Sequence, residues 1–94
     1  MLIDGINYER TDASELQIVV CNSGFVFIGR VATASETEVV IHDARCIRRW
    51  GTTAGLGQLA IQGPQETTVL DPSRTVRVHP LSIVCRIDCE EGKW

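Results

Sequence analysis

Residues 16–31 read Leu16-Gln17-Ile18-Val19-Val20-Cys21-Asn22-Ser23-Gly24-Phe25-Val26-Phe27-Ile28-Gly29-Arg30-Val31. The first six are rich in β-branched side chains, and residues 22–24 are types that accept the positive φ angles of tight turns. The second apolar run therefore returns along the first as a β-hairpin. Gly29 lies inside the returning strand, where a glycine indicates a bulge or the sharp bend of a small barrel.

A third strand is predicted directly after this hairpin. Residues 32–36 form the connecting turn, and residues 37–42 are again rich in β-branched side chains. Asp43-Ala44 interrupts the pattern, which then resumes in extended form over residues 45–50. The region up to Trp50 is thus expected to be entirely β.

One short helix is predicted next, because the periodicity changes after Trp50. Leu56, Leu59 and Ala60 fall on one helical face. Thr52 or Thr53 is suited to cap its start, and Gly63-Pro64 is a strong stop signal.

The remaining third of the chain is expected to add two strands. Residues 65–73 are predicted to be a loop with a turn at Asp71-Pro72-Ser73. Residues 75–79 and 81–87 are strand-like, with Pro80 as a break between them. The polar tail from residue 90 is expected to be frayed, apart from Trp94.

Five short strands with one helix after the third describe a strongly bent sheet that closes on itself. We predict a single domain over residues 1–94, mainly β, folded as a small five-stranded SH3-like barrel. Residues 20–44 resemble the strand pattern of Sm-like small barrels, but residues 33–36 read Thr-Ala-Ser-Glu where that family has an aspartate and an asparagine. An RNA-binding ring is therefore not implied. Residues 1–15 are expected to be a loop or an edge strand.

The charge and size of the chain limit its partners. The chain of 94 residues has twelve acidic and nine basic residues, and its formal charge is therefore −3. A negative net charge disfavours a nucleic-acid partner. The sequence has no apolar run long enough for a membrane span or a signal peptide, so we expect a cytoplasmic location, no membrane partner and free thiols. A chain this small buries a limited core, so we expect it to self-associate as a homo-oligomer.

Residues 45–63 combine three arginines, a tryptophan, two threonines and four glycines. Arginine forks bind phosphate or carboxylate, an indole offers a stacking face, and glycines let backbone N–H groups approach a ligand. Residues 51–57 are either an anion-binding turn at a helix N-terminus or simply a tight turn, and they lack the Walker A lysine and the dinucleotide fingerprint. The predicted ligand-binding residues are Arg45, Arg48, Arg49, Trp50, Gly51, Thr52, Thr53, Gly55 and Gly57.

The alternation of a strand divides these arginines between two faces. Arg48 shares a face with Trp50, and Arg49 shares the other with Arg45. A cation beside an indole on one face and two arginines on the other suit an anionic aromatic ligand such as a nucleotide. The alternatives are arginines paired with acidic side chains, and Trp50 in the core or at a subunit interface.

Metal and catalytic sites are not indicated. Cys85 and Cys89 are separated by three residues, and the other cysteines and the histidines are scattered without the paired C-x-x-C motifs of zinc sites. His42 and Asp43 are neighbours that face opposite sides of a strand unless a bulge intervenes. We expect no metal, no cofactor and no enzymatic activity.

The second half of the chain also carries a family resemblance. The residues concerned are Ile47-Arg48-Arg49-Trp50-Gly51-Thr52-Thr53, Gly55-Leu56-Gly57, Leu59-Ala60, Gly63-Pro64 and Thr68-Val69-Leu70-Asp71. This pattern resembles a family of small proteins of unknown function from bacteriophages and prophages, and it covers most of the chain beyond His42. The resemblance implies a viral or prophage origin and a place in the host cytoplasm, without an established activity.

Three functions are compatible with these observations. The first is a phage-type accessory binding protein that self-associates and holds an anionic ligand, sequestering a nucleotide signal of host defence. The second is a protein-binding inhibitor of a host defence enzyme, with the same arginines and Trp50 as hot spots. The third is a minor structural component of a virion. A ligand site should be concave, whereas an inhibitor surface can be flat.

Overall fold

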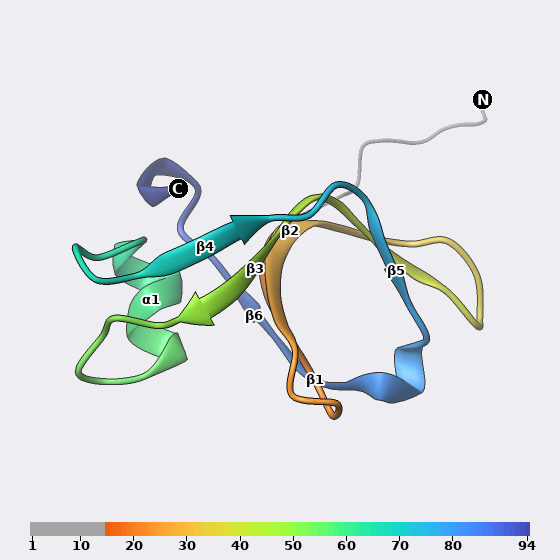
Figure 1. Cartoon of the computed structure of the whole chain (residues 1–94). Helices are drawn as coiled ribbons and strands as arrows, with labels where there is room; N and C mark the ends of the chain where they lie inside the picture. Colours follow the sequence, from red (N-terminus) through yellow and green to blue (C-terminus); the bar gives the residue numbers. More distant parts are fainter. Residues whose placement is uncertain (1–14) are drawn as a thin grey trace.

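The computed structural model describes residues 15–94, so the expectation for residues 1–14 lies outside it. The elements are β1 (Glu15–Cys21), β2 (Val26–Thr33), β3 (Val39–Arg49), α1 (Leu56–Gln62), β4 (Val69–Pro72), β5 (Val76–Val78), η1 (Pro80–Ser82), β6 (Ile83–Asp88) and η2 (Glu91–Lys93). The strands form one antiparallel sheet in the order β4-β3-β2-β1-β6, with β5 also paired to β3 (Figure 1). Within this range no helix is long and apolar enough to cross a bilayer.

The predicted hairpin of β1 and β2 is confirmed. Ile18 lies opposite Ile28, and Val19 lies opposite Phe27. The turn between the strands contains Gly24 at a φ of 99°, which is a conformation that favours glycine.

The bend predicted at Gly29 is also present, as a β-bulge between β2 and β3. Ile28 pairs with Arg45 and Arg30 pairs with His42, so that Gly29 alone faces two residues of β3. A Cβ atom at Gly29 would lie 2.6 Å from Cγ2 of Ile41. The interruption predicted at Asp43-Ala44 is therefore a bulge within one continuous strand, with Asp43 at a φ of 51°.

On the edge away from β2, the long strand β3 pairs with one strand before the bulge and with another strand after it. Its N-terminal part pairs with β5, where Val39 lies opposite Val78. Its C-terminal part pairs with β4, where Ile47 lies opposite Leu70. The prediction of a loop throughout residues 65–73 is wrong, because β4 lies within that range.

Hydrophobic side chains are buried on both faces of β1, β2 and β3. One cluster consists of Ile18, Val26, Ile28, Ile47, Leu59 and Ala60. The other consists of Val19, Cys21, Val31, Val39, Ile41 and Ala44. The predicted helix is confirmed as α1, which supplies its buried face to the first cluster.

The fold class is confirmed only in part. The described chain is mainly β with a single α-helix after the third strand, but the sheet has six strands and not five. No pairing within residues 15–94 joins β5 to β6, so the sheet is not the closed SH3-like barrel that we predicted. Pro80 opens η1 between these strands, and the Leu81 N–H bonds to Nδ1 of His79 at 3.1 Å instead of a neighbouring strand.

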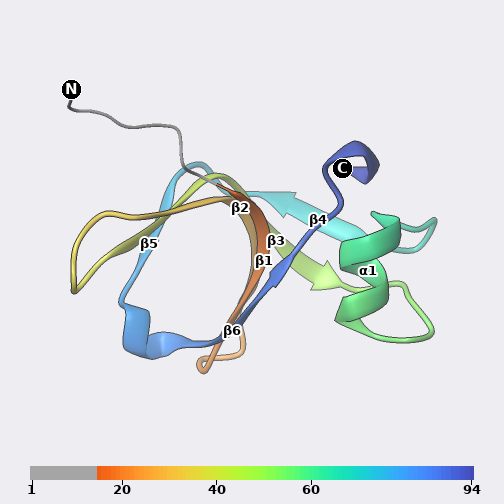
Figure 2. The same cartoon turned by 180° about the vertical axis from the view of Figure 1, so that it is seen from behind.

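The C-terminal tail is packed against the fold, so the prediction of a frayed end is wrong. Residues 91–93 form η2, and Trp94 packs against the cluster that contains α1. The Glu90 N–H donates to the carbonyl of Ala60 at 2.9 Å. Seen from behind, α1 and the C-terminal turn lie at the same end of the molecule (Figure 2).

Candidate functional site

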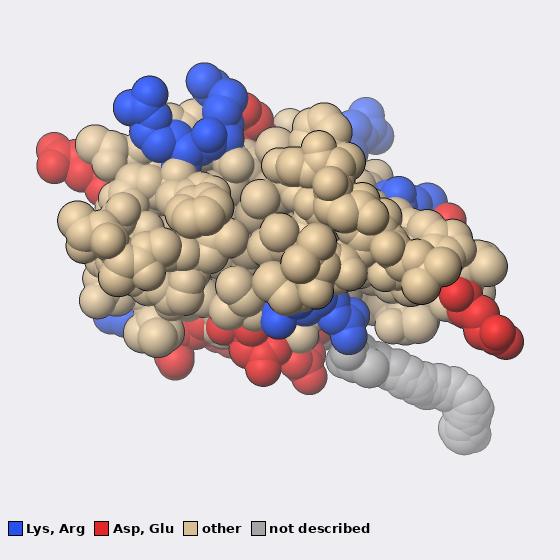
Figure 3. All heavy atoms as spheres, turned by 90° about the horizontal axis from the view of Figure 1, so that it is seen from below, with Lys and Arg blue, Asp and Glu red and all other residues tan. Residues whose placement is uncertain are grey.

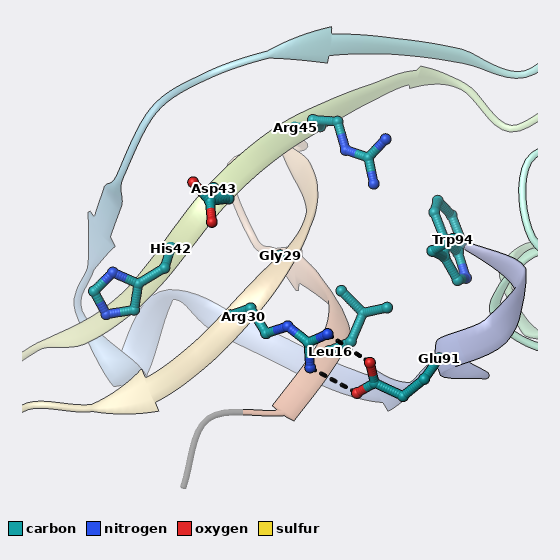
Figure 4. A pocket seen from close by; sticks show the side chains of 8 residues that line it. All are labelled: Leu16, Gly29, Arg30, His42, Asp43, Arg45, Glu91 and Trp94. Carbon is teal, nitrogen blue, oxygen red and sulfur yellow. Dashed lines mark hydrogen bonds and ion pairs between the residues drawn. The ribbon is translucent and has the colours of Figure 1, made fainter. Parts of the chain in front are cut away.

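A cavity of about 380 Å³ opens beside the C-terminal turn, and we call it the Arg45–Trp94 pocket. Its volume lies within the roughly 300–1,000 Å³ that is typical of small-molecule sites. Strands β1, β2 and β3 and the C-terminal turn all contribute to its walls (Figure 4). Its lining residues are Leu16, Gly29, Arg30, His42, Asp43, Arg45, Glu91 and Trp94.

The β-bulge brings the pocket together. His42 and Arg45 are three positions apart, so in a regular strand their side chains would point to opposite faces. The extra residue of the bulge restores them to the same face, and both line the pocket. Gly29, opposite the bulge, also lines the pocket and places no side chain in it.

The strongest ligand-binding feature of the pocket is an arginine over an indole. The guanidinium carbon of Arg45 lies 5.8 Å from the ring centroid of Trp94, within cation–π range. Trp94 is half-buried against the core cluster, and its indole N–H points to the carbonyl of Ala60 at 3.5 Å. The ring is therefore held by the fold, and Arg45 forms the adjoining wall of the cavity.

A second arginine reaches the pocket from β2 and is paired with a carboxylate. Arg30 donates two hydrogen bonds to Glu91, at 2.6 and 2.5 Å. The bond from Arg30 lowers the pKa of the Glu91 carboxyl below its ordinary value. Both side chains remain substantially exposed, at 42% and 58%, so this pair contributes little to the stability of the fold.

Of the nine predicted ligand-binding residues, Arg45 is the one that lines this pocket. Arg48 instead pairs with Asp71, with its Nε 2.8 Å from the carboxylate, and this bond lowers the pKa of Asp71. Arg49 is exposed at the end of β3. Trp50 is 43% exposed, and its carbonyl accepts a hydrogen bond from Thr68 at 2.7 Å. The pairing of Arg48 matches the alternative of a surface ion pair.

The predicted glycine turn is closed by contacts with its own neighbours. Gly51 has a φ of 71°, and a Cβ there would lie 2.5 Å from the backbone nitrogen of Thr68. The hydroxyl of Thr52 donates to the carbonyl of Gly55 at 2.8 Å. Gly55, at a φ of 85°, is the N-cap residue of α1.

The prediction that Thr52 or Thr53 caps α1 is wrong, because the N-cap residue is Gly55 and no side chain of the described residues caps the helix. Oε1 of Gln58 accepts from the Ala54 N–H at 2.7 Å and lies 3.4 Å from the hydroxyl of Thr53. Gly57 lies in the first turn of α1, with open space around it. These contacts match the alternative of a tight turn, and anion binding at residues 51–57 stays a prediction.

Sequence reasoning did not include Arg30, His42, Glu91 or Trp94 in the site. Two features of the sequence could have indicated two of these residues: Arg30 directly follows Gly29, where a bend was predicted, and Trp94 is an aromatic residue in a polar tail. The bulge lies at Asp43-Ala44, directly after His42, and no hydrogen bond joins the side chains of His42 and Asp43 within residues 15–94. No three metal-ligating side chains gather among residues 15–94.

No family model, curated protein or solved structure matches the chain. The resemblance to phage proteins therefore stays a prediction. A functional proposal depends on the pocket and on the exposed surfaces.

Proposed function

We propose that the protein is a non-enzymatic binding protein that holds an anionic, planar ligand, such as a nucleotide, in the Arg45–Trp94 pocket. The observation that carries this proposal is the Arg45 guanidinium over the Trp94 ring in a concave cavity. An indole and a guanidinium both offer flat faces to an aromatic group, and the guanidinium also binds phosphate. The resemblance to phage proteins favours sequestration of a nucleotide signal as the biological role.

Native mass spectrometry of gently purified protein tests this proposal. We expect wild-type protein to retain an extra mass of nucleotide size, and we expect Arg45→Ala to lose it. Arg48→Ala is the matched control, because it removes an arginine that already pairs with Asp71 outside the pocket. That control should retain the extra mass.

Two outcomes would contradict the proposal. If Arg45→Ala keeps the extra mass and Arg48→Ala or Arg49→Ala loses it, the ligand binds at the turn predicted from the sequence. If wild-type protein carries no extra mass and shows no heat of binding with AMP, GMP, CMP or UMP, the pocket is not a nucleotide site.

A second candidate function, a protein-binding inhibitor, is favoured by one exposed surface. Phe25, Leu81 and Val84 are 58%, 84% and 65% exposed, and we call these three residues the apolar end. The Asn22 N–H bonds to the carbonyl of Ser82 at 2.8 Å, so the turn between β1 and β2, which carries Phe25, lies beside the junction of η1 and β6. Seen from below the view of Figure 1, the molecule has a broad uncharged area with most charged side chains toward its margins (Figure 3).

A further inference from the structure

The carboxylate of Glu91 lies in the pocket where a ligand anion would bind. It accepts two hydrogen bonds from the fork of Arg30, which is the geometry in which arginine also binds phosphate. Its side chain points from the C-terminal turn toward Arg30 on β2 (Figure 4). The molecule thus supplies an anionic group of its own to this part of the site.

From this contact we infer that the ligand is a nucleoside monophosphate whose phosphate replaces the Glu91 carboxylate on Arg30. The inference rests on the proposed function, because it assigns the parts of the ligand within the same pocket. The base stacks at Arg45 and Trp94, and the phosphate binds the fork of Arg30. The shared chemistry is one phosphate monoester carried by a planar aromatic compound.

The charges around the pocket explain why the phosphate must replace the Glu91 carboxylate. The side chains that line the pocket include two arginines and two carboxylates, so these four charges cancel. The Asp43 carboxylate points away from the Arg45 side of the cavity (Figure 4). Glu91 therefore neutralises the wall where the phosphate binds, and its departure leaves Arg30 and Arg45 facing the ligand.

The replacement needs only a rotation of the Glu91 side chain. The backbone on its N-terminal side is fixed, because the Cys89 N–H bonds to Leu16 at 3.0 Å and the Glu90 N–H bonds to Ala60 at 2.9 Å. The Glu91 side chain is 58% exposed, so water can receive the displaced carboxylate. The Trp94 ring keeps its packing on the core cluster.

Calorimetric titration with AMP tests the replacement. Glu91→Gln removes the competing charge and should tighten AMP binding roughly tenfold, the effect of a hydrogen bond to a charged group. Glu90→Gln is the matched control, because it makes the same change in net charge one residue away, outside the pocket lining. It should leave AMP affinity unchanged, and both variants should melt close to wild type because the residues are exposed.

The two parts of the ligand are separated by further titrations. Wild-type protein should bind AMP more tightly than adenosine or inorganic phosphate, and Arg30→Ala should bind AMP and adenosine equally. If wild type binds AMP but Glu91→Gln binds it no more tightly, the replacement is wrong and the proposed function stands. If AMP, UMP and adenosine fail to bind both wild type and Glu91→Gln, both proposals are overturned.

Discussion

Gly29 is the single residue on which the bend of the sheet depends. A Cβ at this position would lie 2.6 Å from Ile41 and 2.8 Å from the carbonyl of His42. We expect Gly29→Ala to lower the free energy of unfolding by about 1–3 kcal/mol, because a backbone atom and a buried side chain must move. Gly57→Ala is the control, since nothing lies within 4 Å and alanine favours helix. It should stabilise by up to about 1 kcal/mol. Urea unfolding of both variants measures the difference, and equal stabilities would show that the bulge relaxes freely.

The four cysteines should differ in reactivity. Burial raises the pKa of Cys89 to about 11 and also raises the pKa of Cys21, whereas Cys85 is exposed. A raised pKa leaves less thiolate, which is the reactive form. At pH 8 we expect iodoacetamide to modify Cys85 first and Cys21 and Cys89 last, as measured by peptide mapping over time. Early modification of Cys89 would show that the C-terminal turn does not protect it.

At the residue scale, the sequence identified one member of the pocket and missed its partner. Arg45 stood out because it lies in an unusual cluster of arginines. Trp94 is distant in sequence, and only the packing of the C-terminal turn on α1 brings it to Arg45. No local pattern encodes that contact, because it depends on the register of strands and on a bulge.

Helix α1 packs on the core through one buried face, so a buried and an exposed residue of the same helix can be compared by substitution. Leu59 is fully buried, whereas Ile61 is 66% exposed. We expect Leu59→Ala to destabilise the protein by about 2–5 kcal/mol, because it leaves a cavity in the core cluster. Ile61→Ala should change stability by less than about 0.5 kcal/mol. Thermal unfolding of the two variants gives the comparison, and similar losses would mean that the helix is not anchored by Leu59.

The elements that have a strong local sequence pattern could be predicted, whereas those that depend on pairing between distant strands could not. The hairpin and α1 follow from β-branched runs, glycine turns and helical spacing. Strand β4 was missed because Asp71-Pro72-Ser73 has the composition of a turn and only four residues pair with β3. The barrel does not close at Pro80, where the sequence indicated a break but not that β5 and β6 would remain unpaired with each other.

For the whole molecule, we expect self-association through the apolar end. Phe25, Leu81 and Val84 are large hydrophobic residues that are each more than half exposed, and exposed apolar surface of this kind can mark contacts between proteins. Size-exclusion chromatography with light scattering should show an oligomer that Leu81→Asp and Val84→Asp convert to monomer. Ile61→Asp is the control, because this exposed side chain lies on α1. A wild-type monomer at high concentration would refute the expectation.

The two hydrophobic clusters on opposite faces of β1, β2 and β3 have a consequence for hydrogen exchange. Opening any of these three strands exposes both clusters at once, so their amide protons should exchange only through global unfolding. Strands β4 and β5 each pair with β3 alone and can detach without breaking the rest of the sheet. Their amides should exchange through smaller local openings, so the slowest protons would map the central hairpin and β3.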